Sequence, residues 1–179
     1  MDGALPRAAR REPHPATGVG VHRRDRSPLG ATGAALSERA DCVFCRIVDR
    51  ANEPASYVFE DVDAIAILDV QPVNEGHTLV LPRQHAKLAG ELDDRVAVAM
   101  WNLGRRVAAA IRASGLRSEG VNFLVADGEA AGQDVFHVHL HVIPRFDGDG
   151  FGFTFPPEYR DPKPRPALDE TAARIRAAL

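Results

Sequence analysis

The run His137-Val138-His139-Leu140-His141-Val142-Ile143 has a histidine at every second position, with large apolar residues between them. A β-strand sends successive side chains to opposite faces, so a strand over 136–144 would place all three imidazoles on one face and an apolar row in the core. Neighbouring imidazoles would lie roughly 6–7 Å apart on a regular strand. Three such groups on a rigid element suit a metal ion or an anionic substrate.

The composition excludes several other classes of protein. A chain of 179 residues with 45% hydrophobic residues can bury one core, which predicts a single domain. The formal net charge of −3 argues against a general nucleic-acid binder. No apolar run approaches the ~18 residues of a membrane span, and the arginine-rich N-terminus lacks the apolar segment of a secretory signal. We therefore expect a cytoplasmic protein that binds neither nucleic acid nor membrane.

The chain divides into a predicted tail and a predicted domain. Residues 1–38 are rich in proline, glycine and arginine and have no aromatic residue, which predicts a disordered tail. The domain is expected over 39–179. Its connections are mostly too short for parallel crossovers, which predicts an α+β fold with a five-stranded, mostly antiparallel sheet. Strands are expected at 56–60, 64–69, 76–81, 121–126 and 136–144, a long helix at 92–113 and a short C-terminal helix at 168–179.

The histidine row itself has more than one interpretation. A solvent-facing strand with accidental histidines is one, and a three-histidine catalytic metal site is another. On a regular strand the third histidine lies too far along for easy convergence on one ion. A row that faces a pocket suits a phosphate better, because one imidazole can act as nucleophile while its neighbours donate to the oxygens.

The chain resembles the histidine triad (HIT) superfamily of nucleotide hydrolases and transferases. The signature of that family is His-φ-His-φ-His-φ-φ, where φ is apolar. Residues 127–133 resemble the loop before the triad, and residues 76–82 with His85 resemble the central strand and the turn after it. The resemblance runs from about Cys42 to Arg145. It implies the HIT fold and a symmetric homodimer whose interface involves the helix at 92–113.

The resemblance implies roles for three histidines. His139 would attack the α-phosphorus of a nucleotide and form a nucleotidyl-imidazole intermediate, and His141 would hydrogen-bond the phosphate oxygens. His77 would support the triad from the neighbouring strand, although the residue type alone fits a core histidine as well. An ordinary histidine pKa near 6.5 leaves much of the imidazole neutral and nucleophilic at pH 7.

The resemblance also implies a nucleotide site. Asp69 would accept hydrogen bonds from the ribose hydroxyls, because one carboxylate can take both. The backbone N–H groups of Gly132 and Gln133 would approach the phosphates, which glycine permits. The base would lie in an apolar slot formed by Val43, Phe44, Ile47, Ile67 and Val70.

Two residues depart from the family pattern. Asp134 stands where the phosphoramidate-cleaving branch has serine and the fragile histidine triad branch has threonine, and it counts among the nucleotide-binding candidates. An ionised carboxylate would repel a polyphosphate unless it is paired or protonated. It could also help to protonate a leaving group or cap the loop, and the structural role is slightly favoured. Ala126 replaces the asparagine or glutamine that contacts substrate in those branches.

Cys42-x-x-Cys45 joins His85 and His137 in a plausible Cys2His2 ligand set. In a reducing compartment such a pair indicates metal or redox chemistry more often than a disulfide, and no thioredoxin-like pattern surrounds it. Bacterial members of the family that resemble this chain carry a structural zinc in such a set. The chemistry itself would need no metal. The alternative is that both cysteines are ordinary buried residues near the base.

The leading expectation is therefore hydrolysis or transfer at the α-phosphate of a dinucleoside polyphosphate such as diadenosine tetraphosphate. Cleavage of nucleoside phosphoramidates is the nearest alternative, and phosphorolysis instead of hydrolysis stays open. A nucleotide-binding adaptor without turnover is a different class of answer, which the retention of His77, His139 and His141 disfavours.

Overall fold

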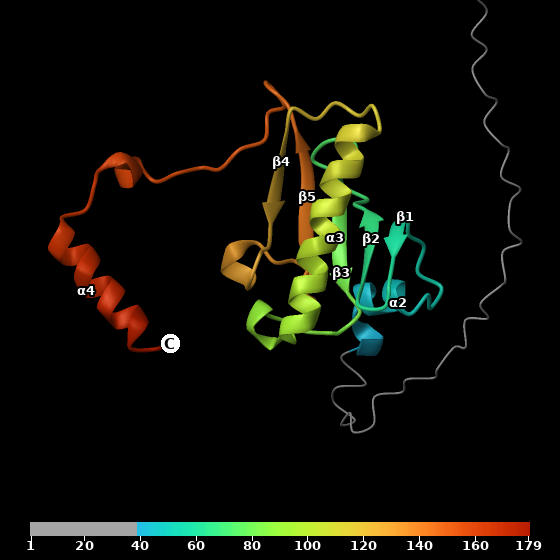
Figure 1. The fold of residues 1–179 in the computed structure, drawn as a ribbon, viewed down its shortest axis with the longest axis horizontal. Coiled ribbons are helices and arrows are strands. Elements are labelled where there is room, and N and C mark those ends of the chain that lie inside the picture. The colour runs from blue at the N-terminus through green and yellow to red at the C-terminus, as the bar shows by residue number, and fades with distance from the viewer. Residues whose placement is uncertain (1–38) are drawn as a thin grey trace, which may run out of the picture.

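The computed structural model describes residues 39–179, so the tail expected at 1–38 lies outside the described residues. The centre of the fold is a five-stranded sheet with the order β1-β2-β3-β5-β4, in which every neighbouring pair is antiparallel (Figure 1). The expected α+β architecture is confirmed. The strands are β1 (Tyr57–Glu60), β2 (Ala64–Leu68), β3 (Thr78–Pro82), β4 (Gly120–Leu124) and β5 (Leu140–Arg145). The helices are α2 (Val43–Val48), α3 (Asp94–Ala113) and α4 (Arg165–Arg176), with short 3-10 turns at Ala89–Glu91, Glu129–Ala131 and Pro157–Arg160.

Both faces of the central strands are covered. Ala64 and Ala66 of β2 belong to the cluster under α3, whereas Ile65 and Ile67 pack with α2 on the opposite face. Side chains that alternate along a strand explain this division, and it accounts for the continuous apolar run in β2. The site described below lies on the α2 face of the sheet.

The long helix α3 lies across one face of the sheet (Figure 1). Its buried residues recur every three or four positions, from Val96 to Ile111, as an amphipathic helix requires. A side chain at Gly104 would place its Cβ 2.5 Å from Leu140 Cδ2, so glycine allows α3 to approach β5 closely. The helix ends before Gly115, whose φ of 85° suits a helix C-terminus.

The segment that carries the histidines differs from the expected regular strand. β5 begins at Leu140 instead of 136. Upstream of it, the His137 N–H donates to the Val135 carbonyl at 2.8 Å, so the chain bends there, and the Val138 N–H donates to the Ala86 carbonyl. Val138 is nevertheless fully buried in the core. The apolar alternation is therefore confirmed, but the three imidazoles do not share one environment.

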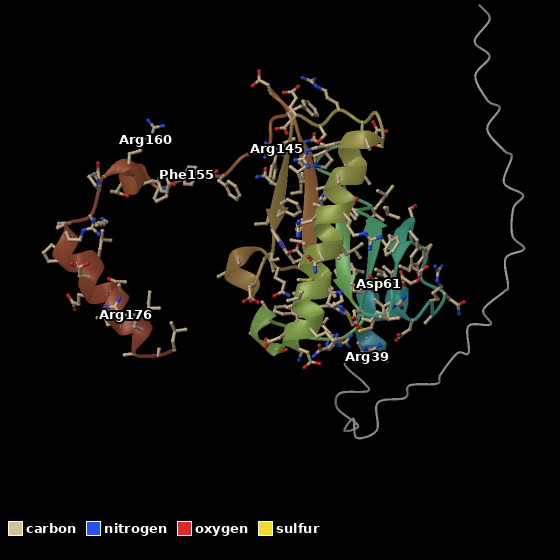
Figure 2. The ribbon with its side chains drawn as sticks, viewed as in Figure 1. Arg39, Asp61, Arg145, Phe155, Arg160 and Arg176 are labelled. Atoms are coloured by element: carbon tan, nitrogen blue, oxygen red, sulfur yellow. The ribbon has the colours of Figure 1, made fainter. Side chains whose placement is uncertain are left out.

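The segment after β5 leads away from the sheet (Figures 1 and 2). Helix α4 begins and ends three residues before the expected 168–179 helix, and none of its residues is buried. Phe155 and Arg176, which Figure 2 labels, lie on this outlying segment. Within residues 39–179, no helix has the length and apolar character that a membrane crossing requires.

Candidate active site and metal cluster

One ring nitrogen of His139 is hydrogen-bonded to the backbone, and the other keeps its lone pair. Its Nδ1 lies 2.7 Å from the His137 carbonyl oxygen, which can only accept, so Nδ1 carries the proton and Nε2 holds the lone pair. The ring lines a cavity of about 510 Å³, and Phe44 packs edge-on against it at 5.0 Å between centroids. Burial lowers the pKa of His139 below its ordinary value, which keeps the ring neutral and nucleophilic at pH 7.

His77 and His141 form a pair beside His139. The Val73 N–H donates to His77 Nδ1 at 3.2 Å, and His77 Nε2 lies 3.0 Å from His141 Nδ1. These contacts place the His77 proton on Nε2, where it donates to His141, and leave His141 with its own N–H at Nε2. Burial, then the neighbouring His139 and His77, lowers the pKa of His141 to about 4. The pair is therefore neutral at pH 7 and offers a hydrogen-bond donor.

The cavity brings together most of the residues that the sequence singled out for a nucleotide. All five expected apolar residues line it, together with Gly132, Asp134, His77, His139 and His141. Asp69 lines it as well and is held in a turn, because its Oδ1 accepts the Gln71 N–H at 2.8 Å. Its Oδ2 lies 3.4 Å from His77 Nδ1. The arrangement combines an apolar slot with a carboxylate that lies directly beside the imidazoles of His77 and His141.

Gln133 is placed differently from the expectation. Its side chain is buried and clamps the loop, accepting the Gly128 N–H and donating to the Lys87 carbonyl, both at 2.8 Å. The backbone N–H groups of Gly132 and Gln133 already donate to the carbonyls of Glu129 and Gly128. The 3-10 turn that precedes them uses both groups, so neither is free for the expected approach to a phosphate.

Asp134 is exposed at the rim of the cavity. Among residues 39–179 it makes no ion pair or hydrogen bond, and it also lines an adjoining hollow of about 420 Å³ with Lys87 and Phe136. Its charge acts on His139, where it opposes the effect of burial on the pKa of that ring. An unpaired carboxylate here bears on which leaving group the site accepts.

The first histidine of the triad belongs to a second cluster. His137 Nε2 donates to the Pro82 carbonyl at 2.9 Å, which leaves the lone pair on Nδ1. That atom lies 3.6 Å from Cys42 Sγ, 3.5 Å from Cys45 Sγ and 3.4 Å from His85 Nδ1. A tetrahedral zinc ion with Zn–S near 2.3 Å and Zn–N near 2.0–2.1 Å would separate its ligand atoms by about 3.3–3.8 Å. The spacing of these contacts fits that requirement.

The chemistry of the four donors fits a metal as well. The Cys45 thiol and backbone N–H both donate to the Cys42 sulfur, so the pKa of Cys42 is lowered to about 3, while the pKa of Cys45 is raised. One thiolate is thus present at neutral pH, as metal binding requires. His85 Nε2 is buried and has no partner among the described residues, so the ring is oriented by the Nδ1 that faces the cysteines.

Sequence reasoning missed one cluster near the site. Asn74, Arg145 and Asp149 are joined by hydrogen bonds next to the loop that leads into His77. The only signal in the sequence is the turn-rich segment 148–152 after the triad, which has low specificity as a motif.

Comparison with known proteins agrees with this geometry. The model of the HIT domain family matches residues 50–148. Protein hit of Bacillus subtilis is 40% identical over 125 residues, which are 69% of this chain and 85% of that protein. The adenylylsulfatase HINT3 of Arabidopsis thaliana is 40% identical over 110 residues, 61% of this chain and 54% of that protein. A Zn-bound histidine triad family protein from Mycobacterium smegmatis has 38% identity and a TM-score of 0.60, over 79% of this chain and 99% of that one. This chain belongs to the HIT family.

Proposed function

We propose that this protein hydrolyses dinucleoside polyphosphates, such as diadenosine tetraphosphate, through a covalent nucleotidyl intermediate on His139. The observation that carries the proposal is the hydrogen bond of His139 Nδ1 to the His137 carbonyl, at 2.7 Å. It leaves the Nε2 lone pair on a ring that lines the cavity. A non-catalytic binding site has no need of a nucleophile in this state.

The reaction has two displacement steps. His139 Nε2 attacks the α-phosphorus, a P–N bond forms, and the P–O bond to the leaving nucleotide breaks with its electron pair on that oxygen. Water then attacks the same phosphorus, the P–N electron pair returns to Nε2, and a nucleoside monophosphate and a proton are released. His141 Nε2–H donates to a non-bridging oxygen and stabilises the charge that develops there.

Binding follows from the composition of the cavity. The slot around Phe44 and Ile67 would take the base, because both residues belong to the buried apolar cluster under α2. The Asp69 carboxylate would accept hydrogen bonds from the ribose hydroxyls. With the nucleoside held between these two features, the α-phosphate would lie beside His139 and His141.

We further propose that Cys42, Cys45, His85 and His137 hold a structural zinc ion. The support is the spacing of the donor atoms and the zinc-bound relative from M. smegmatis. Such an ion would tie α2 and the turn after β3 to the segment before β5, and so hold the backbone carbonyl that orients His139. His137 would then serve the metal and take no direct part in the chemistry.

Two other leaving groups have specific support. The likeness to the adenylylsulfatase HINT3 supports adenylylsulfate, from which the same attack would expel sulfate. The Asp134 carboxylate at the rim has no partner among residues 39–179 and supports a nucleoside phosphoramidate, because it would attract a cationic amine and repel a polyphosphate. All three substrates share the attack by His139 and differ only in the group that departs.

The test is a substrate panel with purified full-length protein. Diadenosine tetraphosphate, adenosine phosphoramidate and adenylylsulfate are each followed by release of AMP. Samples quenched in an alkaline denaturant, which preserves the P–N bond, are examined for AMP bound to His139. The His139→Asn variant is the control, because its amide can keep the bond to the His137 carbonyl while removing the nucleophile. Turnover of none of the three by a wild-type protein that binds AMP would reject the enzyme and favour the adaptor.

A further inference from the structure

A partly buried polar cluster joins the end of β5 to the loop before His77. Arg145, labelled in Figure 2, donates to both carboxylate oxygens of Asp149 and to Asn122 of β4. The Asp149 side chain is only 3% exposed and also accepts the backbone N–H groups of Phe146 and Phe151. The guanidinium of Arg145 holds the pKa of Asp149 well below its usual range, so this buried carboxylate is charged.

Asn74 connects this cluster to the active site. Its side-chain amide donates to Asp149 Oδ2 at 2.9 Å and to the Pro144 carbonyl of β5 at 2.8 Å. Its own carbonyl accepts the His77 N–H at 3.0 Å. The turn formed by residues 70–76 is therefore anchored at Asn74 to the end of the sheet.

The same turn supplies the Val73 N–H that donates to His77 Nδ1 at 3.2 Å. That nitrogen has a second neighbour, the Asp69 Oδ2 at 3.4 Å. The two neighbours favour opposite states, because an N–H donor requires a lone pair on Nδ1 and a carboxylate requires a proton there. The position of the turn decides between them.

Each state of His77 fixes a state of His141 through the contact of 3.0 Å between their rings. With its proton on Nε2, His77 donates to His141 Nδ1, and His141 offers an N–H at Nε2. With its proton on Nδ1, His77 pairs with Asp69 and must accept from His141 Nδ1, which leaves a lone pair on His141 Nε2. A phosphate oxygen would be held in the first arrangement and repelled in the second.

We propose that Asn74 and Asp149 are positioning residues, which hold the 70–76 turn so that the Val73 N–H selects the first of these two proton arrangements. Neither residue lines the cavity, so both act through His77. The effect on phosphate binding rests on the proposed function, whereas the proton arrangement itself does not.

The experiment is nitrogen NMR of the histidine rings in ¹⁵N-histidine-labelled full-length protein. The wild type is expected to show a protonated Nε2 and an unprotonated Nδ1 on both His77 and His141. In Asn74→Ala, which removes both hydrogen bonds of the Asn74 side chain, a substantial share of both rings is expected to carry the proton on Nδ1 instead. Asn122→Ala is the matched control, since it removes a partner of Arg145 from the same cluster but leaves the turn anchored.

Kinetics add a second measurement where a substrate is found. Loss of a donor to the reacting phosphate costs about 10²–10³ in kcat, so a partial switch in Asn74→Ala is expected to lower kcat by roughly tenfold or more, with little change in KM. Wild-type rings that carry the proton on Nδ1 of His77 would overturn the proposal, whether or not the variant folds. A folded Asn74→Ala with the wild-type ring pattern would overturn it too. Absence of turnover would reject the proposed function and leave the NMR test intact.

Discussion

Two clusters contain residues of the same short run of histidines. They differ in which ring nitrogen bonds a backbone carbonyl and which keeps its lone pair. The Nε2–H of His137 donates a hydrogen bond to the Pro82 carbonyl, and its Nδ1 faces the sulfur atoms of Cys42 and Cys45. The Nδ1–H of His139 donates a hydrogen bond to the His137 carbonyl, so its Nε2 keeps the lone pair beside the cavity. Both residues are histidines of the same alternating run, two positions apart. A backbone carbonyl determines whether an imidazole suits a metal or a phosphorus atom.

The two clusters also differ in access. His137 is fully buried, and its Nδ1 is surrounded by Cys42, Cys45 and His85. His139 is 6% exposed and lines the cavity of about 510 Å³. A closed set of four donors is typical of a structural metal site, whereas a reacting group needs an open side. The comparison therefore predicts that changes in one cluster remove turnover and changes in the other remove metal.

The largest expected effect is that of His139→Asn on turnover. Loss of the nucleophile is expected to lower kcat by about 10⁴-fold or more, because both displacement steps pass through this nitrogen. Zinc content and thermal stability are expected to stay at the wild-type level. Single-turnover AMP release and metal analysis on the same preparation check both parts. Turnover of the variant within tenfold of wild type would contradict the assignment of catalysis to the cluster that contains His139.

The reciprocal change is Cys45→Ser, which is expected to remove zinc. An ion present at 1,000 times its Kd stabilises the folded state by about 4 kcal/mol. For a chain of this size, that loss would lower Tm by roughly 8–16 °C. Elemental analysis and thermal unfolding, with a chelator added to the wild type for comparison, measure it. Equal zinc in the variant and the wild type would eliminate the site, and His139→Asn serves as the control that retains the metal.

A smaller effect is expected from pH. Burial lowers the pKa of His141 to about 4 in the folded protein, whereas the unfolded chain takes up a proton near pH 6.5. Between these values the unfolded state binds more protons, so stability is complete above about pH 6.5 and falls as the pH approaches 4. Because the ring is partly exposed and solvent screens its charge, the full loss from this group is about 1–2 kcal/mol.

The measurement for this effect is the free energy of unfolding in urea at several pH values. The His141→Asn variant lacks the group and should show a flatter dependence than the wild type between pH 4 and 6.5. The cluster of Cys42, Cys45, His85 and His137 is unchanged in both proteins, so the difference between them isolates His141. Parallel curves would show that His141 is not the group that binds the proton.

The sequence was sufficient for the sheet and the long helix, because both depend on a periodic pattern of burial. The apolar slot followed from the resemblance to the HIT family and not from periodicity. It was not sufficient for the bend before β5. The alternation of Val138, Leu140 and Val142 reports only which side chains are buried, and an extended chain outside the ladder satisfies it equally. Gln133 was expected to contact a phosphate because residues 127–133 resemble the loop before the triad in the HIT family. The hydrogen bonds within its own turn compete for the same groups, and the spacing of residues does not reveal them.

The cluster of Asn74, Arg145 and Asp149 was harder still to predict from the sequence. The hydrogen bond between Asn74 and Asp149 joins residues 75 positions apart. Each of them is a residue type that turns commonly use, and nothing local distinguishes them from other loop residues. Only the register of β3 against β5 brings the two loops together. Contacts of this kind require the assembled fold.

The smallest expected effect concerns Asp134, which lines both the active-site cavity and the adjoining hollow beside the metal cluster. Replacing it by asparagine removes one exposed negative charge with little change in shape. At this exposure the repulsion of a polyphosphate is worth about 1 kcal/mol, so Asp134→Asn is expected to raise kcat/KM for diadenosine tetraphosphate roughly fivefold at low salt.

The same substitution should lower or leave unchanged kcat/KM for a phosphoramidate with a cationic amine, because that leaving group is attracted by the carboxylate. The ratio of the two kcat/KM values, measured at low and high ionic strength, is therefore the informative quantity. Glu129→Gln, an exposed charge in the same loop that does not line the cavity, is the matched control. If Asp134→Asn changes both substrates by the same factor, the carboxylate shapes the loop and does not select the leaving group. A change in the ratio that salt suppresses would instead assign the choice of leaving group to this single charge at the boundary between the two clusters.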